Sequence, residues 1–88
     1  MKKILVVCGN GLGSSFIVEM NVKNVLRDMG VEASVSHTDL TTAKSEEADL
    51  YIGSRDLISN LEDGNKTIEG LTNILDQNEL RSVLEKHF

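Results

Sequence analysis

The sequence predicts an α/β fold: a flavodoxin-like, three-layer sandwich in which a four-stranded parallel sheet of order 2-1-3-4 lies between helices. An apolar run, Ile4–Val7, leads into a glycine-rich turn and then into a helical stripe of apolar residues. Further strand-like segments alternate with helical ones, which is typical of right-handed βαβ units. The first strand-like run is short, apolar and rich in Val and Ile, as in sheets that are covered on both faces.

Residues 3–8 are expected to form the first strand. The spacing of apolar residues then changes to three or four positions, which predicts a helix from Ser14 or Ser15 to Met29. Gly30 is suited to end that helix. The apolar stripe of the helix consists of Val18, Val22, Val25, Leu26 and Met29. We expect the methionines and Phe16 to pack in the core as well.

Residues 31–37 alternate apolar and polar side chains, which predicts a half-buried strand at an edge of the sheet. Residues 38–47 are polar, and Thr38 or Asp39 could cap a short helix or an irregular crossing there.

Two further strands are predicted at residues 49–53 and 67–71, with a weak helical turn after the first and a turn at residues 63–65. Asp76 is expected to open the last helix, and Glu79 stands at the spacing of a capping box. The buried stripe of this helix is predicted to be Leu80, Val83, Leu84 and Phe88.

Length and composition exclude several classes of protein. With 88 residues and no linker-like segment, we expect a single domain, residues 1–88. A net charge of -5 argues against nucleic acid as a partner, because binding its phosphates needs a basic face. Cys8 is the only cysteine, and a thiol that cannot form an internal disulfide suits a reducing cytosol. The first apolar run is too short to span a bilayer, so we expect a soluble cytoplasmic protein that meets a membrane only through a partner.

The stretch from Cys8 to Ser15 is predicted to be a phosphate loop after strand 1. Its glycines, Gly9, Gly11 and Gly13, let backbone N–H groups point inward, and the helix that follows directs its positive end to the same place. We assign Cys8 as the catalytic residue. The predicted phosphate-binding residues are Gly9, Asn10, Gly11, Leu12, Gly13, Ser14 and Ser15. Ser14 and Ser15 are equally suited to capping the helix.

The residues around the thiol distinguish several kinds of phosphate loop. A nucleotide-hydrolysing loop needs a lysine after the last glycine, but Ser14 follows Gly13. A tyrosine-phosphatase loop has an arginine six residues after its cysteine, and Ser14 occupies that position too. Without a guanidinium to clamp the transferring group, the loop is suited to holding a phosphoryl group rather than hydrolysing its ester. A phosphoryl carrier is the leading interpretation. A low-molecular-weight phosphatase or arsenate-reductase-like enzyme that uses the Cys8 thiolate, and a non-catalytic binding module, remain alternatives.

The strand, the Cys8-Gly9-Asn10-Gly11-x-Gly13-Ser14-Ser15 pattern, and Met20 and Val22 in the next helix resemble the IIB component of the bacterial phosphoenolpyruvate-dependent sugar phosphotransferase system (PTS). Within it, the ascorbate/galactitol group, and ascorbate-specific IIB in particular, is the most similar. The resemblance implies that Cys8 takes a phosphoryl group from a phosphohistidine of a IIA partner and passes it to a sugar or sugar acid, L-ascorbate, bound by a membrane IIC component. It implies a protein-phosphocysteine–sugar phosphotransferase with no metal or organic cofactor.

Several side chains should lie near the loop. His37 is expected to close the second strand on the same edge of the sheet, without a role in transfer, and Ser54 and Arg55 follow the third strand to that edge. Leu12, Phe16 and Ile17 would form an apolar docking surface for IIA, unless the last two are partly in the core. Asp56 and Asp63 are the carboxylates that a phosphatase would use as its acid. His87 is expected at a helix C-terminus for reasons of charge.

Overall fold

The computed structural model describes residues 2–8, 14–61, 64, 66–74 and 76–88. Four parallel strands form one sheet in the order β2-β1-β3-β4, which confirms the predicted topology. The strands are β1 (Lys2–Cys8), β2 (Ala33–Asp39), β3 (Leu50–Ser54) and β4 (Ile68–Leu71). β2 lies at an edge of the sheet, as its alternating sequence predicts.

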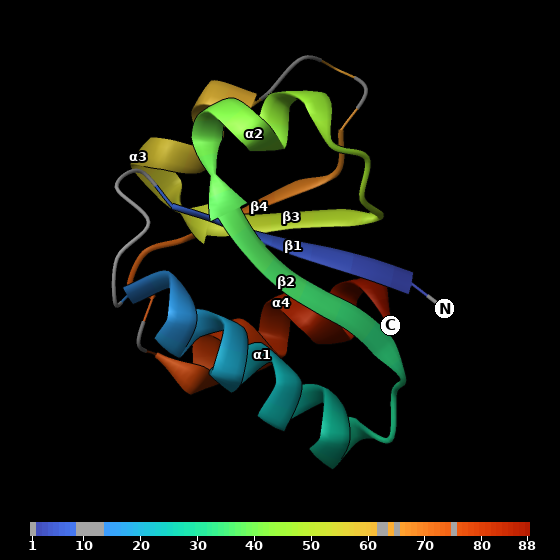
Figure 1. Ribbon diagram of the computed structural model, residues 1–88. Helices are drawn as coiled ribbons and strands as arrows, with labels where there is room; N and C mark the ends of the chain where they lie inside the picture. The colour runs from blue at the N-terminus through green and yellow to red at the C-terminus, as the bar shows by residue number, and fades with distance from the viewer. Residues whose placement is uncertain (1, 9–13, 62–63, 65, 75) are drawn as a thin grey trace.

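Helices cover both faces of this sheet (Figure 1). The longer helices, α1 (Ser14–Met29) and α4 (Gln77–His87), lie side by side on one face. The short helices, α2 (Leu40–Ser45) and α3 (Arg55–Ile58), lie on the other, and a 3-10 turn (Ser59–Leu61) follows α3. The three-layer sandwich is therefore confirmed.

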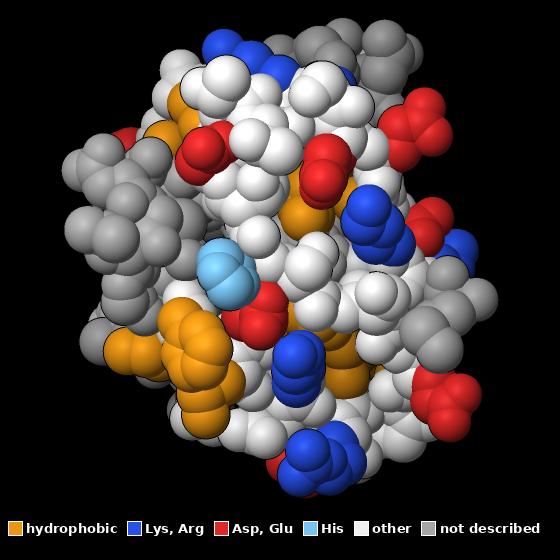
Figure 2. Space-filling view, viewed as in Figure 1, with side chains coloured by type: hydrophobic (Ala, Val, Ile, Leu, Met, Phe, Trp, Pro, Cys, Tyr) orange, Lys and Arg blue, Asp and Glu red, His pale blue; other side chains and the backbone are white. Residues whose placement is uncertain are grey.

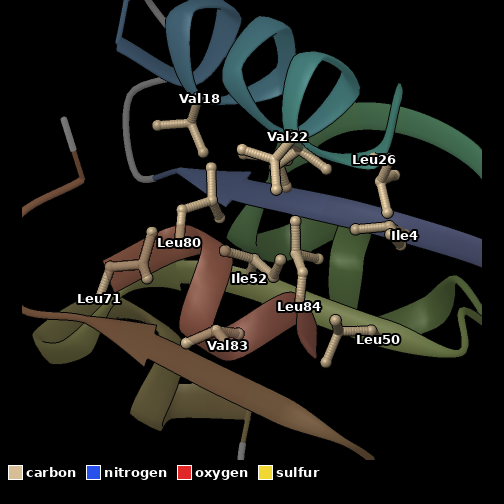
Figure 3. Packing of buried hydrophobic residues seen from close by; sticks show 12 residues of the cluster. Ile4, Val18, Val22, Leu26, Leu50, Ile52, Leu71, Leu80, Val83 and Leu84 are labelled. Carbon is tan, nitrogen blue, oxygen red and sulfur yellow. The ribbon is translucent and has the colours of Figure 1, made fainter. Parts of the chain in front are cut away.

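Alternation along β1 divides the apolar residues between two layers. Ile4 and Val6 pack toward α1 and α4, whereas Leu5 and Val7 pack toward α2 and α3. Figure 3 shows the larger of the two clusters, in which side chains from the sheet meet the stripes of α1 and α4. Its fully buried members include Ile4, Val22, Leu50, Ile52, Leu71, Leu80 and Leu84.

β2 begins two residues later than the alternation suggests, because the preceding residues complete the end of α1. Gly30 has φ 73°, its N–H donates to the Arg27 carbonyl at 3.1 Å, and the Val31 N–H donates to the Leu26 carbonyl at 2.9 Å. This pair of bonds is a Schellman motif. Since the Val31 amide closes the helix, the strand starts at Ala33 and runs past His37 to Asp39.

The caps of α2 and α4 are aspartates, as expected, but the second half of the predicted capping box is absent. Asp39 accepts the Thr42 N–H at 2.7 Å, and Asp76 accepts the N–H groups of Asn78 and Glu79. The Glu79 carboxylate does not return to its own N-cap. It accepts the N–H groups of Thr72 and Asn73 instead, so it ties α4 to the segment after β4.

Two side chains that we expected in the core are on the surface. Phe16 is 55% exposed and Met20 is 48% exposed. The reason is geometric: Val18 and Val22 point the buried stripe of α1 at the sheet, which leaves positions 16 and 20 on the flank of the helix. Met29 is partly buried against the core.

Candidate functional site

The site predicted from the sequence falls at the carboxyl edge of the sheet, where β1 ends at Cys8. β1 is an inner strand, with β2 on one side and β3 on the other, so the chain leaves it at a topological switch point. Ligands of open parallel sheets bind at such points. Cys8 is in register with Asp39 of β2, and Ser54 ends β3 at the same edge.

The first turn of α1 begins six positions after Cys8, and the helix starts at this edge of the sheet (Figure 1). Its N-terminal N–H groups and dipole favour an anion there. Gly9, Asn10, Gly11, Leu12 and Gly13 lie outside the described residues. The structure places Cys8 at the end of β1, and Ser14 and Ser15 at the start of α1. The assignment of this loop to phosphate binding therefore stays a prediction.

Two glycines in register let the next strands and α3 approach this edge closely. A Cβ on Gly53 would stand 2.7 Å from the Val7 carbonyl oxygen, immediately before Cys8, and a Cβ on Gly70 would stand 2.8 Å from the Arg55 Cα. Ile58 of α3 packs over both positions. The pair thus determines where the turn at residues 54–55 lies.

Arg55 is brought to the predicted edge, as the first residue of α3, and its side chain is exposed. Its charge acts on Glu79. The N–H groups of Thr72 and Asn73 hold the pKa of Glu79 below its ordinary value, and the nearby Arg55 guanidinium lowers that pKa further. Arg55 is therefore a cation at the candidate site that faces a carboxylate ionised at neutral pH.

Sequence reasoning missed a pair formed by Glu19 and His37. His37 does not close β2 but lies inside it, in register with Val6, and its Nδ1 is 2.8 Å from Glu19 Oε1. Glu19 Oε2 is 3.4 Å from Lys23 Nζ, and its side chain is only 12% exposed. Burial raises the pKa of Glu19, but the hydrogen bonds from His37 and Lys23 outweigh burial and hold that pKa below its ordinary value.

The other predicted residues are less closely tied to the edge. Asp56 is exposed in the first turn of α3, and Asp63 lies outside the described residues. His87, in the last turn of α4, places Nε2 2.6 Å from Glu69 Oε2 of β4. His87 therefore lies at the C-terminal end of α4, as expected, and also contacts a carboxylate of the edge strand β4.

Apolar side chains are exposed next to the edge. Phe16, Ile17 and Met20 lie on the flank of α1, and Figure 2 shows hydrophobic side chains gathered over the beginning of this helix beside a histidine. The Phe16 ring meets the His37 ring edge-on, with centroids 6.3 Å apart. The sequence left open whether Phe16 and Ile17 lie on the surface or partly in the core. The structure shows that both side chains are exposed.

Neither a metal cluster nor a membrane span is found in the part of the chain that the structure describes. No three His, Cys, Asp or Glu side chains come together there in a way that could hold a metal ion. No described helix has the length and apolar character needed to cross a membrane.

The fold and the edge define a class of small α/β domains in which a cysteine ends an inner strand and a helix begins shortly after it. Comparison with known proteins names the family. The family described as "PTS system, Lactose/Cellobiose specific IIB subunit" matches residues 3–86, and the chain belongs to this family of PTS IIB proteins. Membership implies a part in the phosphoryl relay of sugar uptake.

Relatives of known name cover almost the whole chain. An "Ascorbate-specific PTS system EIIB component" from Mycoplasma pneumoniae is 33% identical over 86 residues, which are 94% of this chain and 90% of the relative. Proteins of the same name from Salmonella typhimurium and Shigella flexneri are each 34% identical over 93 residues, covering 98% of this chain and 92% of theirs. The solved structure of the lactose-specific IIB component domain from Streptococcus pneumoniae has the same fold, with a TM-score of 0.67 at 16% identity, over 99% of this chain and 98% of that one.

Proposed function

We propose that this protein is an ascorbate-type IIB phosphoryl carrier, and that Cys8 is the residue that carries the phosphoryl group. One observation supports this most strongly: the only cysteine of the chain ends the inner strand β1, just before the helix whose start faces the same edge, in a chain that belongs to the PTS IIB family. The names of the relatives, which match over nearly the full length, indicate L-ascorbate as the substrate.

The proposed cycle has two transfers. The Cys8 thiolate attacks the phosphorus of a phosphohistidine on a IIA partner, so that an S–P bond forms as the P–N bond breaks and the donor imidazole takes up a proton. A hydroxyl of the sugar acid, bound by a membrane IIC component, then attacks the same phosphorus. The S–P bond breaks, the hydroxyl proton is released, and the thiolate is regenerated. The activity is that of a protein-phosphocysteine–sugar phosphotransferase.

The residues from Gly9 to Ser15 would cradle the phosphoryl group through backbone N–H groups and the Ser14 and Ser15 hydroxyls, with the dipole of α1 behind them. Such a cradle stabilises a dianion without positioning a water for hydrolysis. In this proposal residues 1–88 are one IIB domain, and the protein works in the cytoplasm with IIA and IIC as partners.

The direct test is phosphorylation with purified proteins. The protein is mixed with phosphoenolpyruvate, the general PTS proteins and an ascorbate-type IIA, and its intact mass is measured. We expect one phosphoryl group that requires IIA, is absent from Cys8→Ser, and remains in His37→Gln and His87→Gln, which remove the only histidines. Phosphorylation of Cys8→Ser, or none of the wild type with any IIA, would overturn the proposal. Turnover of p-nitrophenyl phosphate would then favour the phosphatase alternative.

A further inference from the structure

We propose that this protein forms a weak two-fold dimer through the outer edge of β2. In this dimer the exposed apolar residues at the start of α1, Phe16, Ile17 and Met20, fill a groove on the second copy. The surface involved is named the β2 edge face and consists of β2 and the flank of α1 beside it. The inference goes beyond the proposed function, because a chain can dimerise whether or not Cys8 carries a phosphoryl group.

β2 is an edge strand with an open outer side. In the described part of the chain it pairs with β1 alone, in a register that continues without a bulge from Ala33 to Asp39. Alternate residues of an edge strand direct their N–H and C=O groups away from the sheet, where they can pair with another strand. Proteins usually protect a long edge with lysine, proline or a bulge, and β2 has none of these over its seven residues. The other edge strand, β4, has only four residues, so β2 is the edge to which a further strand can add.

The flank of α1 beside β2 has an apolar projection at one end and a groove at the other. Phe16 and Met20 are exposed near the start of the helix, and the Phe16 ring meets the His37 ring edge-on. Further along, a groove of about 390 Å³ lies between α1 and β2, and its apolar lining is formed by Leu26, Val31, Ala33 and Val35. Figure 2 shows both features on one face: hydrophobic side chains project over the start of α1, and others lie recessed further along, beside basic side chains.

A two-fold axis brings the projection of one copy to the groove of the other. Antiparallel pairing about an axis at Ser36, the middle of β2, is the register that pairs all seven residues of the strand. It places Val35 of each copy opposite His37 of the other. Within one copy, the Phe16 ring contacts the His37 ring, and Val35 lines the groove. The Phe16 end of each copy therefore meets the groove of the other, and this contact occurs twice, as in other isologous interfaces.

Charges at the two ends of the β2 edge face also match. Arg27 lines the groove and forms no ion pair in the part of the chain that the structure describes. Asp39 is exposed at the other end of β2. In the register centred on Ser36, Asp39 of one copy lies opposite Ala33 of the other, and Ala33 lines the same groove as Arg27. Opposite charges thus come together at both ends of the dimer.

The remaining charges limit the affinity. Glu19 and Lys23 lie 3.4 Å apart and pair within each copy, so they offer little to a second one. Glu32 lines the groove and reduces the positive charge beside Arg27. The net charge of -5 repels a second copy, although salt screens charges further apart than about 8 Å at physiological ionic strength. We therefore expect a transient dimer with a micromolar dissociation constant.

The first test is the mass of the whole protein in solution, measured by sedimentation equilibrium from about 1 μM to about 1 mM, a range that brackets micromolar dissociation constants. The buffer contains a reductant, so that Cys8 cannot link two chains through a disulfide. We expect the mass to rise with concentration from 9.7 kDa toward twice that value. A mass that stays at the monomer value at the highest concentration overturns the proposal.

Two variants and a control locate the interface. Ser36→Lys places two like charges opposite each other at the axis, which should keep the protein monomeric. Phe16→Ser removes an apolar side chain from each groove and should raise the dissociation constant at least about tenfold. Ser59→Lys makes the same charge change at an exposed serine in the 3-10 turn after α3, and its dimer should match that of the wild type. A wild-type dimer that neither Ser36→Lys nor Phe16→Ser weakens uses another face and contradicts the proposal.

A mixture of two variants tests the axis itself. Ser36→Glu alone should be monomeric for the same reason as Ser36→Lys, but an equimolar mixture of the two brings opposite charges together at the axis. We expect the mixture to dimerise where neither variant does alone. Circular dichroism and urea unfolding show whether both variants are folded; if they are and the mixture stays monomeric, the two-fold axis at Ser36 is wrong. If either is unfolded, Phe16→Ser decides, because its side chain is exposed and its loss leaves the core intact.

Self-association and phosphoryl transfer fail separately. A dimer in a protein that takes no phosphoryl group from any IIA retains this inference and removes the proposed function. A monomer in which Phe16→Ser slows phosphoryl uptake retains the proposed function, assigns the apolar start of α1 to IIA alone, and rules out the dimer.

Discussion

Replacing Gly53 by alanine measures how closely β1 and β3 approach beside the candidate site. The new Cβ would lie 2.7 Å from the Val7 carbonyl oxygen and 3.4 Å from Ile58 Cδ1. The oxygen belongs to the backbone of an inner strand, so it cannot move without disturbing the sheet. Overpacking of this kind costs about 2 to 3 kcal/mol. That is a large part of the roughly 4 to 13 kcal/mol expected for a domain of this length.

The assay is urea unfolding followed by circular dichroism. With an m-value of about 1.5 kcal/mol per molar, the loss lowers the midpoint by roughly 1.3 to 2 M. Gly30→Ala is the control: Gly30 has φ +73°, but a Cβ added there would have no neighbour within 4 Å, so its cost is backbone strain alone, about 1 kcal/mol. A Gly53→Ala midpoint no lower than that of Gly30→Ala would refute the close approach of the two strands.

Three further predictions concern the two sides of the sheet. Leu84→Ala empties a fully buried position of α4 and should lower the free energy of unfolding by about 3 kcal/mol, read from urea unfolding. Tyr51→Phe leaves the Ala48 N–H without the hydroxyl that accepts it, and should cost about 1 to 2 kcal/mol in the same measurement. Glu79 has a lowered pKa, so its contribution is complete above the ordinary value of 4.5 and is lost as pH falls through the folded-state pKa. Glu79→Gln should therefore show a smaller loss of thermal stability on acidification than the wild type, and an equal loss would contradict this.

The order of the strands could be predicted from the sequence because each step depended on contiguous residues. An unbroken apolar run indicated an inner strand, and alternation over 31–37 indicated an edge strand. The errors arose where two elements share residues. Val31 fits the alternation of a strand, but its amide completes the helix cap. Glu79 has the spacing of a capping box, yet the amides after β4 take up its carboxylate. Spacing along the chain does not reveal which of two available partners a polar group will bind.

The same limit applies to the site. Cys8 and the start of α1 are only six positions apart in the sequence, so their common position at one edge of the sheet was predictable. The contact between Glu19 and His37 joins a helix to an edge strand 18 positions away, and it depends on how α1 is rotated over the sheet. The only indication in the sequence was that Glu19 lies beside the apolar stripe of the helix and has Lys23 four residues after it. A solvent-exposed ion pair has the same spacing, so the sequence did not reveal that Glu19 is largely buried and contacts His37.

This difference bears on how partners are distinguished. The fold is retained in a lactose-specific IIB domain at 16% identity, so the same fold occurs in IIB proteins that are named for different sugars. In the proposed cycle the loop next to Cys8 would hold the same phosphoryl group whichever sugar is transported, which would leave it little freedom to vary with the partner. The flank of α1 and the outer strand β2 carry no such constraint. Exposed residues of these two elements, such as Phe16 and His37, are therefore where we expect IIB proteins of different specificity to differ most.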